Sequence, residues 1–170
     1  MRIAVTGYSG AGKSTLARQL GERLGIPVLH LDTVQFTPGW VERDRAEALE
    51  LVERFMERES WVIDGNYGGF AYERRMAMAE RIVVLDFPRR ICLPRVVLRW
   101  LRNRGRTRPD MAEGCAEKLD LEFVLWVLWK GRTRAFRQRL AGLEARYPGK
   151  TAVLRRPRQA AEYLERLGTR

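Results

Sequence analysis

The chain has 170 residues and a formal net charge of +11, and 45% of its residues are hydrophobic while 31% are charged. This length suits one domain with a sizeable core, and the composition excludes a disordered chain, a membrane-spanning run of roughly 20 apolar residues and a disulfide framework. The single histidine leaves no cluster for zinc, and the strand that begins at Arg2 leaves no room for a signal segment. We therefore expect a cytoplasmic protein in which residues 1–170 form one domain.

Short apolar segments alternate with amphipathic segments along the whole chain. The predicted strands are Ile3–Thr6, Pro27–Leu31, Trp61–Asp64, Arg81–Phe87 and Thr151–Leu154. The predicted helices are Ser14–Leu24, Arg45–Glu59, Tyr72–Glu80, Ile91–Asn103, Glu117–Arg146 and Pro157–Leu167. This alternation indicates an α/β fold of three layers, with a five-stranded parallel sheet and helices on both faces.

The turn after the first strand carries a phosphate-binding motif. Residues 7–14, Gly-Tyr-Ser-Gly-Ala-Gly-Lys-Ser, match G-x-x-x-x-G-K-[ST] between a predicted strand and a predicted helix. The glycines let backbone N–H groups turn toward phosphates, and the helix adds its positive dipole. Lys13 is expected to reach the β- and γ-phosphates, and the Ser14 hydroxyl to coordinate Mg²⁺. The residues predicted to bind ATP here are Gly7, Gly10, Ala11, Gly12, Lys13, Ser14 and Thr15.

A phosphate loop (P-loop) alone is shared by kinases, GTPases and motor ATPases. GTPases need N-K-x-D for guanine, and none of the four lysines stands in such a motif. The chain is also short for a motor ATPase. A small kinase is therefore favoured.

Aspartates end three of the predicted strands. In a parallel sheet the carboxyl ends of the strands open onto the ligand crevice. We expect Asp64 to organise Mg²⁺ together with Ser14, and Asp32 to face a phosphoryl acceptor. For each of these residues, and for Asp86, the alternative is a cap on the following turn.

The positive charge is concentrated in the second part of the chain. Residues 1–70 hold 8 basic and 10 acidic residues, whereas residues 71–170 hold 24 and 11. Eight arginines and no acid lie within residues 89–108, and such a field attracts nucleotide phosphates or nucleic acid. Residues 103–114 carry glycines and a proline around basic residues, which is typical of a mobile lid beside a phosphate site or of a solvated surface loop.

Several segments together resemble a known family. They are His30-Leu-Asp32 with Pro38-Gly-Trp40, Trp61-Val-Ile-Asp-Gly-Asn-Tyr67, Leu85-Asp-Phe-Pro88, and Gly105-Arg-Thr-Arg-Pro-Asp110 leading to Gly114-Cys-Ala-Glu-Lys118. On these residues the chain resembles the P-loop nucleoside monophosphate kinase-like family, and most closely its DNA topology modulation proteins, which are often labelled adenylate kinase-related. The resemblance runs from Met1 to about Leu167.

The resemblance implies a P-loop NTPase fold with a mobile lid and phosphoryl transfer from ATP. Adenylate kinases carry two arginines spaced by four after the fourth strand; Arg95 matches the one that stacks on adenine and Arg99 the one that contacts phosphates. The lid candidates are Arg104, Arg106 and Arg108, and the residues expected to stabilise the transferring phosphoryl group are Lys13, Arg99 and Arg106.

The chain departs from adenylate kinases after the third strand. Their Asp-Gly-Phe-Pro-Arg segment is replaced by Asp64-Gly-Asn-Tyr-Gly68, so the arginine that holds the acceptor phosphate is missing. Arg43 and Arg75 are the candidates to replace it, together with Asp32 as a substrate-binding residue. The acceptor therefore stays open.

Two functions follow from these patterns. The first is a phosphotransferase that uses ATP and Mg²⁺ and acts on a small-molecule acceptor. The second is an ATP-binding, DNA-associated protein that uses the arginines of residues 89–108. Weak non-specific nucleic-acid binding is compatible with the first, no membrane partner is expected, and the aromatic residues Phe123, Trp126 and Trp129 belong to the core of a monomer or to a homodimer face.

Overall fold

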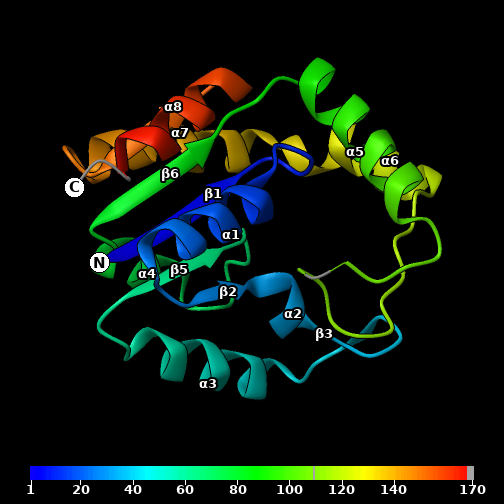
Figure 1. Ribbon diagram of the computed structural model, residues 1–170, viewed down its shortest axis with the longest axis horizontal. Helices are drawn as coiled ribbons and strands as arrows, with labels where there is room; N and C mark the ends of the chain where they lie inside the picture. The colour runs from blue at the N-terminus through cyan, green and yellow to red at the C-terminus, as the bar shows by residue number, and fades with distance from the viewer. Residues whose placement is uncertain (109, 168–170) are drawn as a thin grey trace.

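The computed structural model describes residues 1–108 and 110–167. Its main sheet has five parallel strands in the order β2–β5–β1–β6–β7, as Figure 1 shows. Their bounds are β1 (Arg2–Gly7), β2 (Val28–His30), β5 (Trp61–Asp64), β6 (Arg81–Leu85) and β7 (Thr151–Leu154). The predicted α/β class with a five-stranded parallel sheet is confirmed. Because β1 is central, the loop that follows it starts from the middle of the sheet.

Helices cover both faces of this sheet. Figure 1 shows α1 and α8 on the side nearer the viewer and α7 behind β6, while α3 lies below the edge strand β2. The bounds of the longer helices are α1 (Lys13–Leu24), α3 (Arg45–Met56), α4 (Tyr72–Met78), α5 (Arg89–Asn103), α7 (Arg134–Arg146) and α8 (Pro157–Leu167). Within the described part of the chain, no helix is long and apolar enough to cross a membrane.

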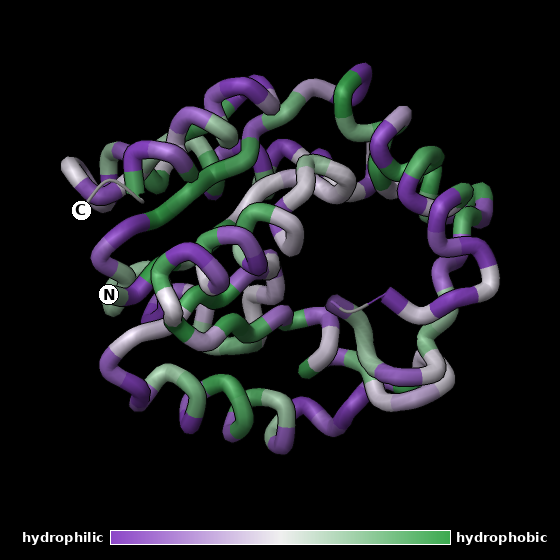
Figure 2. Tube along the Cα trace, in the orientation of Figure 1, coloured by the Kyte–Doolittle hydropathy of each residue, from purple (hydrophilic) through white to green (hydrophobic). Residues whose placement is uncertain are grey.

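The strands form the core because their side chains are apolar on both faces. Residues of β1, β5 and β6 are almost entirely buried, and the fully buried Trp61 and Ile3 are among the largest side chains of the core. Figure 2 shows β6 as a continuous hydrophobic stretch of the trace, whereas hydrophobic and hydrophilic residues alternate along α3. Fully buried parallel strands read as continuous apolar runs, which is why their bounds agree closely with the prediction.

The single long helix predicted over Glu117–Arg146 is wrong. The chain instead forms α6 (Leu121–Leu128), a short 3-10 helix (Lys130–Arg132) and α7. Each α-helix has its own N-cap: the Asp120 side chain accepts from Phe123 N at 2.7 Å, and Thr133 accepts from Phe136 N at 3.1 Å. These caps satisfy the first amides of two separate helices, so the chain turns between them.

A small excursion between β2 and α3 was not predicted. It consists of α2 (Leu31–Gln35) and an antiparallel hairpin of β3 (Phe36–Thr37) and β4 (Val41–Glu42), which we call the β3–β4 hairpin. The hairpin turns at Gly39 and Trp40, which have φ angles of 81° and 66°. A bulky residue rarely adopts a positive φ, so the surrounding contacts of Trp40 must hold it there.

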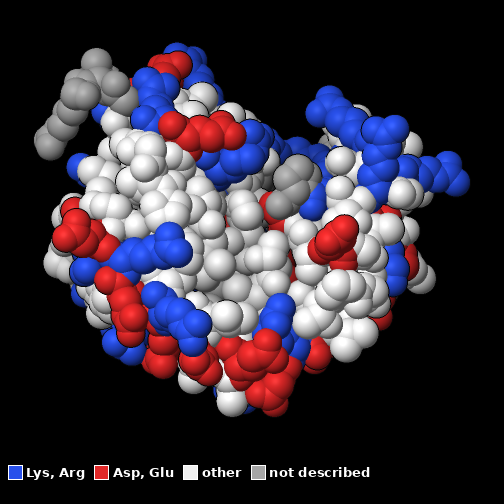
Figure 3. Space-filling view, turned by 60° about the horizontal axis from the view of Figure 1, so that its bottom comes forward, with Lys and Arg blue, Asp and Glu red and all other residues white. Residues whose placement is uncertain are grey.

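Charges are unevenly spread over the surface. Figure 3 shows acidic and basic residues intermixed over the lower part of the molecule, where α3 lies, and basic residues crowded at the upper right. On the side of the molecule that Figure 3 shows, basic residues thus gather away from the region of mixed charge.

Candidate active site

The P-loop leaves β1 and enters α1 through three glycines with positive φ. Gly7, Gly10 and Gly12 have φ angles of 137°, 78° and 93°. A Cβ on Gly7 would lie 2.4 Å from the Leu85 carbonyl oxygen, so this strand end tolerates no side chain. The N-cap residue of α1 is Gly12, which has no side chain to bond the first amides of the helix, and such amides suit an anion.

Asn66, in the loop after β5, holds the P-loop from the side. Its Oδ1 accepts from Thr6 Oγ1 at 2.8 Å and from Gly7 N at 3.2 Å, and its Nδ2 donates to Gly7 O at 2.7 Å. A role for Asn66 was not predicted. The signal in the sequence that could have predicted this role is its polar side chain directly after Asp64 and Gly65, where the strand ends.

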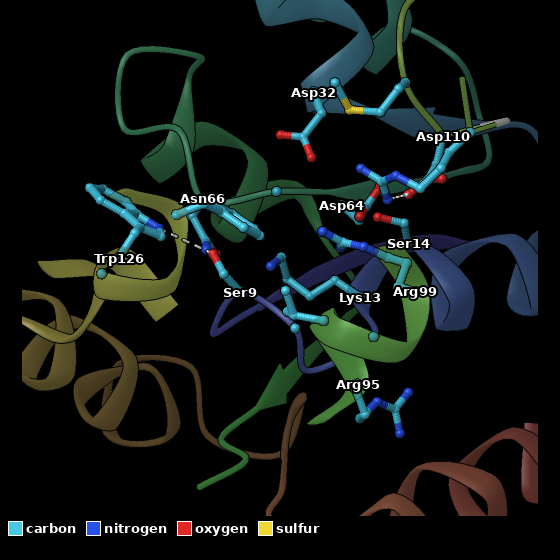
Figure 4. Close-up of a pocket in the computed structure, with 18 of the residues that line it drawn as sticks. Ser9, Lys13, Ser14, Asp32, Asp64, Asn66, Arg95, Arg99, Asp110 and Trp126 are labelled. Carbon is cyan, nitrogen blue, oxygen red and sulfur yellow. Dashed lines mark hydrogen bonds and ion pairs between the residues drawn. The ribbon is translucent and has the colours of Figure 1, made fainter. Parts of the chain in front are cut away.

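A cavity of about 1210 Å³ opens in front of the P-loop. Figure 4 shows Lys13, Ser14, Asp32, Asp64 and Arg99 around it, contributed by different elements. The lining residues that the sequence predicted are Gly10, Gly12, Lys13, Ser14, Thr15, Asp32, Asp64, Arg95, Arg99 and Arg108. The P-loop, the segments that directly follow β2 and β5, and helix α5 are therefore brought to one place, as expected for the carboxyl edge of a parallel sheet.

The two carboxylates of the cavity have defined partners. Asp64 is 4% exposed, and its Oδ1 lies 2.5 Å from His30 Nδ1. Burial disfavours a charged ring, but the hydrogen bond to Asp64 and the charge of that carboxylate together raise the pKa of His30. Asp32 Oδ1 accepts a hydrogen bond from the Tyr67 hydroxyl at 2.8 Å, and burial beside Asp32 raises the pKa of Tyr67. Tyr67 is therefore a protonated donor that fixes the direction of Asp32.

Lys13 is half-buried at the end of the P-loop, and its Nζ donates to Tyr8 O at 3.3 Å. Burial lowers the pKa of its ammonium group, although Asp32 and Asp64 oppose the shift. A desolvated ammonium group beside free amides is well placed to bind an anion.

Magnesium would fit this site only together with a phosphate ligand. The Ser14 hydroxyl and the Asp64 carboxylate supply oxygen ligands at the same cavity. Among the residues that the structure describes, no three His, Cys, Asp or Glu side chains gather to hold a metal alone. Mg²⁺ usually takes one or two protein oxygens and completes its shell with substrate phosphates and water, so this donor set fits a metal that arrives with a nucleotide.

Two cavity arginines share one buried acid. Glu117, whose side chain is 3% exposed, accepts from Arg99 Nε at 2.8 Å and also contacts Arg108 Nε through its other oxygen. Arg108 Nη1 donates to Asp110 Oδ2 at 2.7 Å. Arg95 lies over the Phe87 ring at 6.0 Å and, in Figure 4, points away from Asp32 and Asp64. The arginines thus approach the P-loop from two different sides.

The loop between α5 and α6, which contains Glu117, is docked on the β3–β4 hairpin. Trp40 Nε1 donates to Ala116 O at 3.2 Å, and Trp40 N donates to Cys115 Sγ at 3.3 Å. Cys115 Sγ in turn contacts Thr37 O at 3.4 Å. These contacts close one side of the cavity. They are made by Cys115 and Ala116, directly after the predicted lid (103–114), of which Pro109 lies outside the described residues. The mobility of the lid stays a prediction.

Four arginines of the sequence analysis are not among the described residues that line the cavity. Arg75 is fully buried and donates to the carbonyls of Phe70, Tyr67 and Gly65, so it holds the backbone after β5. Arg43 donates to Val34 O and pairs with Glu47. Arg104 lies over Trp100, and Arg106 is exposed. Conversely, Arg139, which was not predicted, lines the cavity and donates to Asn66 O at 3.2 Å.

A P-loop at the carboxyl end of a central parallel strand, facing carboxylates and arginines, defines a protein of the P-loop kinase class. A family profile described as an AAA domain matches residues 3–122. The chain belongs to this AAA domain family, and within it to the kinase-like P-loop proteins related to nucleoside monophosphate kinases.

The individual relatives carry kinase names. The shikimate kinase of Bacteroides fragilis is 32% identical over 152 residues, which cover 81% of each chain. The protein named "Putative adenylate kinase" of Methanocaldococcus jannaschii is 30% identical over 71% of this chain and 69% of its own. A protein of the same name from Pyrococcus abyssi is 28% identical, and this chain spans 64% of its length. Among solved structures, shikimate kinase from Acinetobacter baumannii in complex with shikimate superposes with a TM-score of 0.59 at 19% identity, over 98% of this chain and 89% of that one, which is a likeness of fold.

Proposed function

We propose that this protein transfers the γ-phosphoryl group of Mg·ATP to a hydroxyl group of a small acceptor. The observation that carries the proposal is that Lys13, Ser14, Asp64, Arg99 and Asp32 line one cavity. Phosphoryl transfer needs little covalent help from the protein, so positioning and charge neutralisation provide most of the catalysis. Kinase names among the relatives support a phosphotransferase.

Each residue has a role that its position supports. Lys13 and Arg99 neutralise the charge that builds up on the transferring group, and Ser14 and Asp64 hold the Mg²⁺ that accompanies the nucleotide. The acceptor oxygen forms a bond to the γ-phosphorus while the bond to the β–γ bridging oxygen breaks, and ADP leaves. Asp32 accepts the hydroxyl proton, and the hydrogen bond from Tyr67 aims its carboxylate.

The acceptor side favours a hydroxyl compound without a phosphate of its own. The two arginines expected to hold an acceptor phosphate are committed elsewhere, Arg75 to backbone carbonyls and Arg43 to Glu47. Asp32 and the aromatic rings of Phe36, Trp40 and Tyr67 line the cavity. The cations beside them have protein partners, since Arg139 donates to Asn66 O and Lys118 lies over the Trp40 ring. A carboxylate among aromatic rings suits hydroxyl groups and the faces of a ring-shaped acceptor better than a second anion.

The test is ATP consumption over a panel of nucleosides, nucleoside monophosphates, sugars, polyols and hydroxy acids. We expect turnover with a phosphate-free hydroxyl compound, and a loss of roughly a hundredfold or more in kcat for Asp32→Asn with ATP binding retained. Glu42→Gln, an exposed carboxylate of the β3–β4 hairpin, is the matched control and should retain full activity. If no compound stimulates ATP consumption, or if Lys13→Ala turns over like the wild type, the proposal is wrong.

A further inference from the structure

A second cleft lies at the carboxyl ends of β6 and β7, apart from the cavity in front of the P-loop. Its volume is about 900 Å³, and six arginines line it: Arg89, Arg90, Arg132, Arg137, Arg155 and Arg156. They come from the first turn of α5, the region that opens α7 and the β7–α8 connection. Figure 1 shows the connection from β6 to α5 passing beside the first turn of α8.

Most of this positive charge is not neutralised. Asp86 is the carboxylate among the described lining residues, and it pairs with Arg155 at 3.5 Å. Arg132 is committed to the protein, since it lies over the Tyr8 ring at 3.7 Å and donates to Phe87 O at 2.9 Å.

The four remaining guanidinium groups have no acidic partner anywhere in residues 1–108 and 110–167. They are Arg89, Arg90, Arg137 and Arg156, and all four are exposed. Like charges held around one concave surface repel each other and create a focused positive potential, which an anion relieves. The 15-residue helix α5 begins at Arg89 with no side-chain cap, so its positive end adds to the same field.

The floor of the cleft indicates what kind of anion fits. Its aromatic residues Tyr8 and Phe87 are only 5% and 1% exposed, so their rings are covered and offer no stacking surface to nucleobases. Recognition there depends on charge and on the planar forks of arginine, which match phosphate oxygens. Tyr8 also belongs to the P-loop, and its carbonyl holds Lys13, so the cleft backs directly onto the candidate active site.

We propose that this arginine cleft is a second anion site that binds a compact oligophosphate, separate from the nucleotide phosphates at the P-loop. The spread of four free guanidinium groups around one cleft suits several linked phosphates better than a single one. The inference does not depend on phosphoryl transfer, because it concerns binding on the opposite side of Tyr8.

The experiment is calorimetric titration of tripolyphosphate into the full chain carrying Lys13→Ala, so that binding at the P-loop is weakened. When Arg89→Gln, Arg90→Gln and Arg137→Gln are added to the Lys13→Ala chain, its affinity for tripolyphosphate should fall roughly tenfold or more. The charge-matched control carries Arg54→Gln on α3, Arg58→Gln in the turn after α3 and Arg74→Gln on α4, and should change the affinity less than about twofold. Thermal melts of both triple variants check that they are folded.

Three results would overturn the proposal. They are no measurable tripolyphosphate binding, equal weakening in the control, and binding of a single-stranded oligonucleotide of about 20 nucleotides that is much tighter than tripolyphosphate and is lost in the cleft variant. The last result would assign the cleft to nucleic acid. The proposed kinase activity fails independently, in the acceptor panel, so the two failures can be told apart.

Discussion

Arg99 and Glu117 join α5 to the loop that covers the cavity: Nε and Nη2 of Arg99 both lie 2.8 Å from the same oxygen of Glu117. The carboxylate is buried, and its second oxygen contacts Arg108. One acid therefore fixes Arg99, which the proposed reaction requires near the phosphates, together with a second arginine that lines the cavity. Glu117 acts through these arginines and is a positioning residue.

Replacing Glu117 by Gln should lower kcat by roughly tenfold while changing ATP affinity much less, because the two arginines lose their common anchor. Arg99 and Arg108 would also lose the negative charge that they share, which should lower the free energy of unfolding by about 1–3 kcal/mol. The loss is smaller than for a fully buried ion pair because Arg99 is partly exposed. Steady-state kinetics and denaturant titration measure both effects. Glu113→Gln, an exposed acid of the same loop, is the control, and unchanged turnover in Glu117→Gln would argue against the positioning role.

Lys13→Ala should abolish most of the rise in Tm that Mg·ATP produces in the wild-type protein. At a ligand concentration about 100 times Kd, binding stabilises the native state by about 2.7 kcal/mol, which thermal denaturation detects easily. Arg18→Ala, an exposed residue of the same helix, should keep the full shift. An undiminished shift in Lys13→Ala would remove the P-loop as the nucleotide site.

Thiol labelling can test whether the predicted lid opens. Cys115 is 1% exposed and belongs to the α5–α6 loop, where its thiol contacts the β3–β4 hairpin. Cys92 is fully buried in α5, where burial raises the pKa of its thiol. Opening of the lid exposes Cys115 alone, so it should label faster than Cys92 and more slowly when an ATP analogue is bound. The variants Cys115→Ser and Cys92→Ala separate the two signals. Equal labelling rates at both positions, or no effect of the analogue, would mean that this loop does not open as a lid.

Arg75→Met should destabilise the fold by about 3 kcal/mol, because it removes the donors of several buried carbonyls. The neighbouring exposed Arg74→Met should change the unfolding free energy by less than about 0.5 kcal/mol. Denaturant unfolding gives both values. A stable Arg75→Met protein with a raised KM for the acceptor would restore the sequence-based interpretation of Arg75 as a substrate ligand.

The features that were predicted well depend on local patterns. The P-loop motif, the buried strands and the strand-end acids Asp32 and Asp64 follow from spacing and from continuous apolar runs, so they appear where expected. The DNA topology modulation relationship, cytoplasmic location, nucleic-acid binding and oligomeric state stay predictions.

The features that were missed depend on contacts across the chain. The charge of an arginine does not say where it points, and only the fold shows that Arg75 faces carbonyls while Arg139 faces the cavity. The docking of Trp40 on Cys115 joins residues 75 positions apart, which no local pattern encodes. The split between α6 and α7 was readable from Asp120 and Thr133, but the aromatic periodicity of residues 123–129 concealed it.

The strand order makes the P-loop side of the cavity more rigid than the side that carries Asp32. The P-loop leaves β1, which is paired on both sides, whereas Asp32 follows the edge strand β2 and is surrounded by short elements. Amide exchange should therefore be slowest in β1 and much faster in α2 and the β3–β4 hairpin, which open without global unfolding. Substitutions around Asp32 should consequently cost little stability, so this side of the cavity can change its lining while the P-loop keeps its conformation.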